Sequence, residues 1–398
     1  MRIIHIDETF HPSFGYQAAP LAKFNAQAGH EVFIIAPEAR YIYPVYKDFG
    51  VDESTIPEED KFYSEQTGVK IIRVHAHGYV ANRLNYCKDE LYSKIDEIRP
   101  DVLFVHCVET LTAIRVMKKY KNTYPMVFDS HMLSMASTSR FSKIYEVAYR
   151  IFVTSLIKKN KYTVIRTQDD DYVTRHLGIP QKQAPFISFG TDVLLFTTNE
   201  EAKRNFLKKN NFSEDAFVIV STGKVAAAKG GKLLAEALKK RFDSSRPVVC
   251  VIVANFDGEY EKEVKEILEQ SENTILFYPV QKYMNLPWFY QIADVTVFPK
   301  QCSMSFYDAQ SCGSPVILET GHVNEARVAH DNGLCFKSGN LEDFRNQVIK
   351  MMEMDTISYQ MMRKNARMFI EKDYSYVDIS DRYLAECKKA IASFQNRR

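Results

Sequence analysis

The stretch that decides the fold reads VIVSTGKVAAAKGG, from Val218 to Gly231. Its β-branched apolar run ends in Gly223 and Lys224, and Lys229 with two glycines then precedes an apolar pattern of helical spacing. A strand, a short loop and a helix N-terminus in this order form an anion site, because unpaired backbone N–H groups and the helix dipole point toward the loop. The two lysines add positive charge that suits the two phosphates of a nucleotide diphosphate. A surface loop with solvated lysines is the alternative that this stretch alone leaves open.

Length and composition describe a globular protein of two domains. The chain has 398 residues, which is too long for one typical core. Its 45% hydrophobic and 26% charged residues are ordinary, and a net charge of +2 gives no reason to expect nucleic acid as a partner. The seven cysteines lie far apart without a C-x-x-C pair, so we expect reduced thiols and neither a disulfide framework nor a zinc site.

Neither a leader peptide nor a membrane span is expected. The first residues, MRIIHIDE, contain too short an apolar run and too early an acidic pair for a signal peptide. No uninterrupted apolar run approaches the ~18 residues that a membrane span needs. These features predict a cytoplasmic protein, at most peripheral to the inner face of the plasma membrane.

Strand-like and helix-like segments alternate along the chain. The strand-like runs are mostly continuous in apolar residues, which is typical of strands buried on both faces of a parallel sheet. They lie at Ile3–Ile6, Val32–Ile35, Val69–Val74, Val102–His106, Met126–Asp129, Tyr162–Arg166, Phe217–Thr222, Val248–Ala254, Thr274–Tyr278, Val295–Phe298, Pro315–Leu318 and Leu334–Phe336. This order predicts two successive doubly wound α/β domains with a boundary near Pro185–Phe196. The segment Ser375–Gln395 is predicted to be one helix that packs on an existing sheet.

Four further motifs follow the order found in a known family. They are FHPSFGY at 10–16, MVFDSH at 126–131, SFGTDVLLF at 188–196 and DAQSCGSPVI at 308–317. With the phosphate loop between the last two, the chain resembles the retaining family 4 of GT-B glycosyltransferases over essentially its whole length. The resemblance implies an α/β fold of two Rossmann-like doubly wound domains that face a central cleft. Residues 1–188, with a helix at about 376–398 packing back, would form the acceptor domain, and 189–375 the donor domain.

The resemblance also implies an activity. The protein would be a hexosyltransferase-type enzyme, independent of metals and cofactors, in cell-surface polysaccharide or glycoconjugate synthesis. It would move a sugar from a nucleotide-diphosphate sugar, of UDP or GDP type, to a glycan or lipid-linked acceptor. Breaking the bond between the anomeric carbon and the diphosphate leaves negative charge on the departing phosphate, which fixed donors and cations stabilise.

The matching motifs place site residues in three groups. Catalytic roles are expected for His131, Lys224 and Lys229. Donor-binding roles are expected for Gly15, Gly223, Gly230, Lys300, Asp308 and Glu325. Tyr16 and His106 are expected on the acceptor side, and no metal ligand is expected. Structural roles stay open for the two histidines, which each end a strand, and for Glu325, whose carboxylate suits a helix start.

Several positions depart from the family's pattern. Tyr16 stands where a second glycine is common, and Phe189 replaces an asparagine. Lys224 replaces an arginine, which keeps the charge but loses bidentate geometry. Asp308 stands for the second glutamate of the E-x7-E region, which holds the nucleotide ribose. Lys300 occupies the place of the first glutamate, which contacts the donor sugar, and a lysine there suggests a donor sugar that carries a carboxylate.

Two patterns have competing interpretations. Asp169–Asp171 contains D-x-D, which binds a divalent cation in the other glycosyltransferase fold. First-turn aspartates also stabilise a helix, and we favour that role here. The segment Arg140–Lys161 interleaves basic and aromatic residues, as in helices that lie on anionic membranes. A core helix with a solvated basic face is the alternative.

Two rival functions remain on the same fold. One is a catalytically degenerate module that binds a sugar nucleotide or a protein partner, which the missing first glutamate and Phe189 favour. The other is a nucleotide-sugar epimerase. Retention of the two lysines, Asp308 and His131 favours a transferase. The sequence has neither a G-x-G-x-x-G after the first strand nor a G-x-S-x-G motif, which argues against a dinucleotide oxidoreductase and an α/β-hydrolase.

Overall fold

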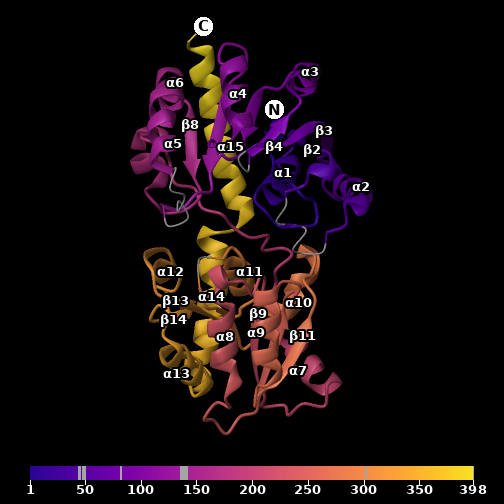
Figure 1. Ribbon diagram of the computed structural model, residues 1–398, viewed down its shortest axis with the longest axis vertical. Coiled ribbons are helices and arrows are strands. Elements are labelled where there is room, and N and C mark those ends of the chain that lie inside the picture. The colour runs from indigo at the N-terminus through magenta and orange to yellow at the C-terminus, as the bar shows by residue number, and fades with distance from the viewer. Residues whose placement is uncertain (44–45, 47–50, 81–82, 135–141, 301–302, 398) are drawn as a thin grey trace. The chain divides into compact units, whose positions relative to one another are not determined.

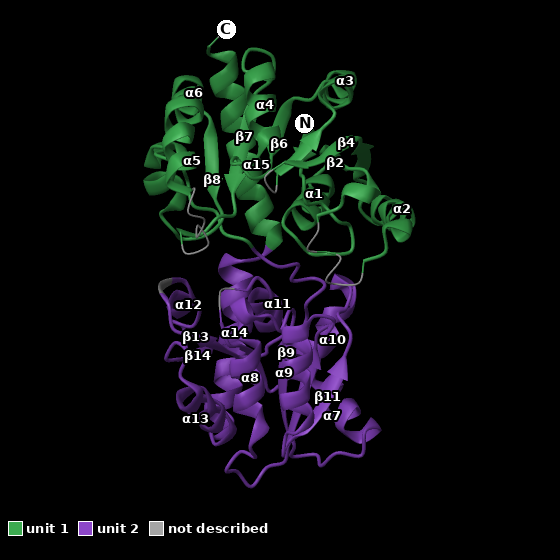
Figure 2. Ribbon diagram, viewed as in Figure 1, with its two compact units in different colours: residues 1–47, 51–189, 376–398 green, residues 48–50, 190–375 purple. Residues whose placement is uncertain are grey.

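The protein is described by a computed structural model that covers residues 1–43, 46, 51–80, 83–134, 142–300 and 303–397 (Figure 1). The chain divides into two compact units, which Figure 2 colours separately. Unit 1 comprises the described residues up to 189 together with 376–397, and unit 2 comprises 190–375.

The centre of unit 1 is a six-stranded parallel sheet. Its strand order is β3-β2-β1-β6-β7-β8. The strands are β1 (Arg2–Ile6), β2 (Glu31–Pro37), β3 (Lys70–Val74), β6 (Val102–Val105), β7 (Met126–Ser130) and β8 (Thr163–Arg166). Their apolar side chains enter cores on both faces of the sheet: Ile4 and Ile6 lie in one cluster and Ile3 in another. Burial on both faces explains why these strands are continuous in apolar residues.

Helices cover the two faces of this sheet. They are α1 (Ala18–Gln27), α2 (Ile56–Thr67), α3 (Lys88–Ile98), α4 (Leu111–Tyr120), α5 (Ser142–Tyr149) and α6 (Ser155–Asn160). A π-helical turn, Arg150–Thr154, joins α5 to α6. A small antiparallel pair, β4 (Ala76–Val80) and β5 (Arg83–Tyr86), stands apart from the main sheet.

Helix α15 (Tyr376–Gln395) completes unit 1 from the far end of the chain. One side of it, with Ile379, Tyr383, Leu384 and Cys387, packs into the same core as Ile3 of β1. This helix runs beside α1 and against β6 and β7. The core of unit 1 therefore needs residues from both ends of the sequence.

Unit 2 repeats the same architecture. Its six-stranded parallel sheet has the order β11-β10-β9-β12-β13-β14. The strands are β9 (Phe217–Thr222), β10 (Val248–Val253), β11 (Thr274–Tyr278), β12 (Val295–Phe298), β13 (Val316–Glu319) and β14 (Gly333–Phe336). The helices are α7 (Glu200–Lys209), α8 (Gly231–Lys239), α9 (Glu259–Glu269), α10 (Leu286–Gln291), α11 (Ser305–Ser311), α12 (His322–Arg327), α13 (Leu341–Met352) and α14 (Thr356–Asp373).

The structure confirms the predicted pair of doubly wound sheets. Every strand predicted from an apolar run is present, with ends that shift by a few residues. The predictions missed β4 and β5, whose short polar and aromatic residues give no buried apolar run. The cysteines among the described residues are free thiols, as expected. Within the described residues, every helix is too short or too polar to cross a membrane.

Candidate functional site

Sheet topology points to one ligand-binding edge in each unit. In a doubly wound sheet, ligands bind outside the carboxyl ends of the strands, where the strand order reverses. That point lies between β1 and β6 in unit 1 and between β9 and β12 in unit 2. The loops that leave these four strands carry most of the residues that the sequence predicts for a site.

The phosphate loop of unit 2 follows β9 directly. Gly223 has φ +105°, which favours glycine, and its N–H donates to the carbonyl of Val253 on β10. Half-buried Lys224 and Lys229 flank the next turn, and Lys229 ends a short 3-10 turn just before α8 begins. The predicted arrangement of strand, lysines and helix N-terminus is therefore present.

Two glycines fit this loop tightly against its surroundings. A Cβ on Gly231 would lie 1.7 Å from the carbonyl oxygen of Val225, so this position accepts only glycine. Gly230 has φ +76°, and a Cβ there would lie 2.9 Å from the Cβ of Lys300. Lys300 follows β12 and is exposed. Pro299 and Lys300, which follow β12, therefore lie beside the phosphate loop, as the reversal of strand order requires.

Asp308 lies inside unit 2 rather than at an open surface. It is 6% exposed on α11, and its Oδ1 accepts hydrogen bonds from Thr191 Oγ1 at 2.5 Å and Tyr283 OH at 3.3 Å. Burial raises the pKa of this carboxyl group to about 7, against the two hydrogen bonds, which lower it. A contact between Asp308 and a ribose stays a prediction, as does a donor contact of Glu325, which is exposed on α12.

The glycine loop of unit 1 connects β1 to α1. Gly15 is half-buried in this loop, and Tyr16 is 39% exposed, with its ring 5.7 Å from that of Tyr46. Tyr16 therefore presents an aromatic edge at the surface of unit 1. An acceptor contact of this side chain is compatible with its exposure and stays a prediction.

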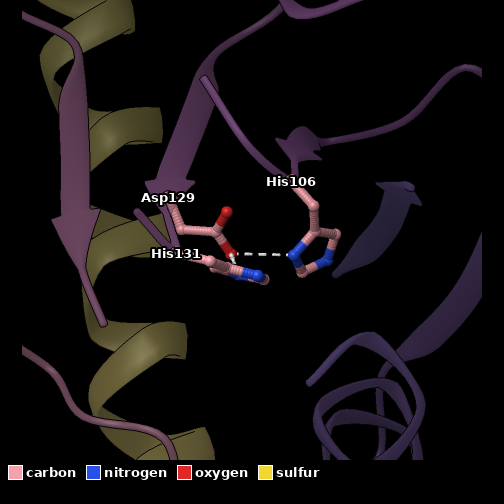
Figure 3. A group of neighbouring side chains, drawn as sticks. All are labelled: His106, Asp129 and His131. Carbon is pink, nitrogen blue, oxygen red and sulfur yellow. Dashed lines mark hydrogen bonds and ion pairs between the residues drawn. The ribbon is translucent and has the colours of Figure 1, made fainter. Parts of the chain in front are cut away.

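A buried carboxylate joins two histidines at the ends of β6 and β7 (Figure 3). His106 Nδ1 donates to Asp129 Oδ2 at 2.8 Å, and His131 Nε2 forms an ion pair with the same oxygen at 3.3 Å. The other carboxylate oxygen accepts the backbone N–H of Cys107 at 2.7 Å. Asp129 is completely buried, whereas the side chain of His131 is 28% exposed. Of the two histidines, His131 can reach a ligand.

The hydrogen bonds continue from His106 to the last helix of the unit. His106 Nε2 and His5 Nδ1 are 3.1 Å apart, and His5 Nε2 lies 3.0 Å from Asn25 Nδ2. Asn25 Oδ1 accepts the hydroxyl of Ser380 on α15 at 2.7 Å. At one end of this chain Asp129 accepts a hydrogen bond, and at the other end the Asn25 amide group donates one. The imidazole rings of His106 and His5 therefore both fit as neutral tautomers with Nδ1 protonated. His106 is therefore buried and holds Asp129 in position, and its acceptor-side role stays a prediction.

Electrostatics keep the exposed member of this group charged. Burial would raise the pKa of Asp129, but the charge of His131 and the hydrogen bond from His106 hold it well below its usual range. Burial would lower the pKa of His131, but Cys107 and Asp129 outweigh burial and raise it well above the ordinary value. Since burial raises the pKa of the Cys107 thiol to about 11, Asp129 is the anion present near pH 7. Asp129 therefore favours the charged form of His131.

His106, Asp129 and His131 each offer one possible metal-ligand atom, and these atoms lie within 4.8 Å of one another. Among the described residues, this is the group that could hold a metal ion. Two ligands about 2.0–2.1 Å from a tetrahedral zinc ion are roughly 3.3 Å apart. The 2.8 Å between His106 Nδ1 and Asp129 Oδ2 is shorter and fits a hydrogen bond. The geometry fits a protonated triad better than a metal site.

Two further expectations concern the loops of unit 1. Asp170 accepts the backbone N–H of Tyr172 at 2.7 Å just before a π-helical turn, Tyr172–His176, whose N-cap residue, Asp171, makes no side-chain cap hydrogen bond. Phe189, the replacement for an asparagine, is buried, and its ring packs edge-on against His131 with centroids 5.0 Å apart. Phe189 therefore supports the charged histidine.

Sequence reasoning missed three members of these sites. Asp129 and His5 lie within apolar strands, where a buried polar residue is a signal in its own right. Arg327 is also buried, at the end of α12. The pattern around Arg327 gives no sign of burial, because α12 is short and partly polar.

Comparison with known proteins agrees with this description. Residues 202–369, which lie within unit 2, match the family model "Glycosyl transferases group 1". Over 204 residues the chain is 22% identical to a GDP-mannose-dependent monoacylated alpha-(1-6)-phosphatidylinositol monomannoside mannosyltransferase of Corynebacterium glutamicum, covering 48% of this chain and 53% of the relative. A lipopolysaccharide 1,2-N-acetylglucosaminetransferase of Salmonella typhimurium matches with the same identity and coverage. The matched stretch spans about half the length of these relatives.

Solved structures resemble the chain along nearly its whole length. A glycosyltransferase from Rickettsia africae has a TM-score of 0.74 at 14% identity, covering 98% of both chains. Anabaena HepE in complex with UDP and glucose has a TM-score of 0.72 at 16% identity, covering 98% of this chain and all of the other. These likenesses confirm the GT-B fold of two Rossmann-like halves.

Proposed function

We propose that the protein is a glycosyltransferase that moves a sugar from a nucleotide-diphosphate sugar to a glycan or lipid-linked acceptor. The observation that carries this proposal is the phosphate loop of unit 2, with Lys224 and Lys229 at the reversal of strand order, inside the stretch that matches group 1 glycosyl transferases. The names of the matched relatives, a mannosyltransferase and an N-acetylglucosaminetransferase, support a donor of this class.

In the proposed reaction the loop of unit 2 receives the leaving group. The bond between the anomeric carbon and the diphosphate breaks, an acceptor oxygen bonds to that carbon, and the acceptor's proton leaves. Lys224 and Lys229 offer positive charge where negative charge develops. Two cations at the leaving group support a reaction without a metal ion, and the motifs that resemble the retaining family support retention of the anomeric configuration.

Unit 1 supplies a histidine, His131, to the proposed reaction. His131 is charged, fixed by Asp129 and Phe189, and partly exposed at the carboxyl end of β7. An imidazolium donates hydrogen bonds through both ring nitrogens and therefore suits an oxygen that gains negative charge. We assign it to orienting a sugar hydroxyl or steadying the transition state.

Nucleotide binding tests the proposal. Thermal unfolding should be measured with UDP, GDP and their common sugar conjugates, because a ligand at 100 times its Kd adds about 2.7 kcal/mol of stability. We expect one nucleotide series to raise the unfolding temperature. Slow hydrolysis of the same sugar donor without an acceptor would separate a transferase from a degenerate binding module, and an epimerised donor would identify the epimerase. No stabilisation by any nucleotide would contradict the proposal.

We further propose that unit 1 contacts an anionic membrane through the segment 142–161. Ile144, Val147, Ile151 and Phe152 are between 57% and 69% exposed on α5 and the following turn. The segment also carries five basic residues, Lys143, Arg150, Lys158, Lys159 and Lys161, and one acidic residue, Glu146. Exposed apolar side chains among cations suit the boundary of an anionic lipid surface. Arg140 and Phe141, which belong to the predicted basic segment, lie outside the described residues.

Vesicle sedimentation at low salt tests this contact. The wild type should bind vesicles that contain phosphatidylglycerol more strongly than vesicles of phosphatidylcholine alone. The double variant Ile151→Ser/Phe152→Ser should bind at least tenfold more weakly, because each buried side chain contributes about 1.5–3 kcal/mol. The matched control is Ile357→Ser/Met361→Ser, which removes two exposed apolar residues from α14. Equal binding by all three proteins would refute the contact.

A further inference from the structure

Arg327 is a buried, rigidly held cation in unit 2. It is 4% exposed at the end of α12. The guanidinium carbon lies 4.0 Å from the ring centroid of Phe306 and 5.2 Å from that of Tyr307. Nη1 donates to the carbonyl oxygen of Ser303 at 2.9 Å. Two rings and one carbonyl therefore fix the position of the group.

The charge of this guanidinium is not balanced nearby. Within the part of the chain that the structure describes, no carboxylate forms an ion pair with Arg327, and its buried Nη2 has no hydrogen-bond partner. A buried charge without a partner is unfavourable, and a guanidinium binds a carboxylate or phosphate through two parallel hydrogen bonds. The side chain is therefore prepared for an anion that the protein itself does not provide.

The position of Arg327 relates it to the phosphate loop. Ser303, which accepts its hydrogen bond, is three residues from Lys300, so their Cα atoms are at most about 11 Å apart. Lys300 in turn lies against Gly230 of the phosphate loop. Helix α12 follows β13, which pairs with β12. Through Ser303 and Lys300, Arg327 is thus connected to the segment after β12 that contacts the phosphate loop.

We propose that Arg327 binds a carboxylate carried by the sugar of the nucleotide donor, so that the substrate class is a nucleotide-activated uronic acid. This inference rests on the proposed function and names its donor. A carboxylate supplies both the missing charge and the acceptors for Nη2, whereas the hydroxymethyl group of a neutral hexose supplies no charge. Exposed Lys300, whose Cβ faces Gly230, adds a second cation beside the phosphate loop.

Affinity for matched donors tests the assignment by calorimetry. The probes are UDP, UDP-glucose and UDP-glucuronate, and GDP, GDP-mannose and GDP-mannuronate. We expect the uronate of one series to bind the wild type at least tenfold more tightly than its neutral counterpart. Arg327→Gln should remove this preference and change the affinity for the nucleoside diphosphate alone by less than about twofold. Lys232→Gln, which removes an exposed cation paired with Glu263 just beyond the same loop, is the matched control and should keep the preference.

Each other outcome has a distinct meaning. If the nucleoside diphosphate binds but the uronate has no advantage, or keeps it in Arg327→Gln, the assignment of Arg327 is wrong. If Arg327→Gln weakens the binding of the nucleoside diphosphate as much as the binding of the uronate donor, Arg327 contacts the diphosphate and the inference also fails. If no nucleotide binds the wild type, the proposed function falls together with the inference. Unfolding curves check that Arg327→Gln is folded, and Arg327→Lys, which keeps the charge, should retain part of the preference if the first variant is unstable.

Discussion

Replacing Lys229 by alanine is expected to lower kcat/KM for sugar transfer by about 100- to 1,000-fold, which is the usual effect of removing one fixed donor from developing negative charge. Lys229 ends the turn that precedes α8, and the tight fit of Gly230 and Gly231 fixes this turn against its neighbours. The lysine therefore does not need to be repositioned as the diphosphate leaves. The effect should fall mainly on kcat, because the charge on the leaving group grows in the transition state.

Steady-state kinetics with the donor identified by thermal unfolding measure this effect. Lys232→Ala is the control. Lys232 follows Lys229 by three residues, lies in the first turn of α8 and forms an exposed ion pair with Glu263. Its kcat/KM should change by less than about threefold, in keeping with the small contribution of exposed pairs. If Lys229→Ala and Lys232→Ala lose the same small amount of activity, the phosphate loop does not stabilise the leaving group.

Replacing Asp129 by asparagine is expected to reduce the free energy of unfolding by about 3–5 kcal/mol, because it leaves a buried charge without its partner. The carboxylate joins His131, His106 and the N–H of Cys107, so one substitution weakens three contacts. Glu31→Gln is the matched control, since Glu31 also pairs with two cations, Arg2 and Lys70, but is 40% exposed. The loss of stability caused by Glu31→Gln should be much smaller than that caused by Asp129→Asn, because exposed ion pairs contribute little.

The loss caused by Asp129→Asn should depend on pH. The pKa of Asp129 is lowered, so its contribution is present above the unfolded pKa of about 3.9 and is lost as pH falls through the folded value. The pKa of His131 is raised, so its contribution is present below about 6.5 and is lost as pH rises through the folded value. Urea denaturation of wild type and variant should differ most between about pH 4 and 6.5. A difference that keeps rising above that window would contradict the charged pair.

The sequence predicts the two sheets well because burial on both faces leaves a local signal. Each parallel strand appears as a continuous apolar run, and the loop after β9 contains the glycines and lysines of its own site. The hydrogen-bonded histidines have no such signal. His5 and His106 are 101 residues apart and meet only because β1 and β6 are neighbours in the sheet. Reasoning from single strands assigns them separately and misses the pair.

The burial of polar residues is a second feature that the sequence does not predict. Asp308 and His106 are predicted to face ligands, and these contacts stay predictions. What the sequence does not predict is their partners: Thr191 and Tyr283 donate hydrogen bonds to Asp308, and Asp129 and His5 lie within hydrogen-bond distance of His106. Arg327 is the reverse case, since a residue near the end of a short polar helix gives no indication that two aromatic rings cover it. These outcomes depend on partners that lie far away in the sequence.

Helix α15 makes unit 2 an insertion within unit 1. The chain leaves unit 1 after Phe189 and returns at Tyr376, and Thr191 N–H donates to the carbonyl of Tyr374 beside these two crossings. During synthesis, residues 190–375 form a contiguous segment that emerges before α15, whereas the core around Ile3 lacks one wall until that helix arrives. All the residues of unit 2 are therefore synthesised before the helix that completes the core around Ile3.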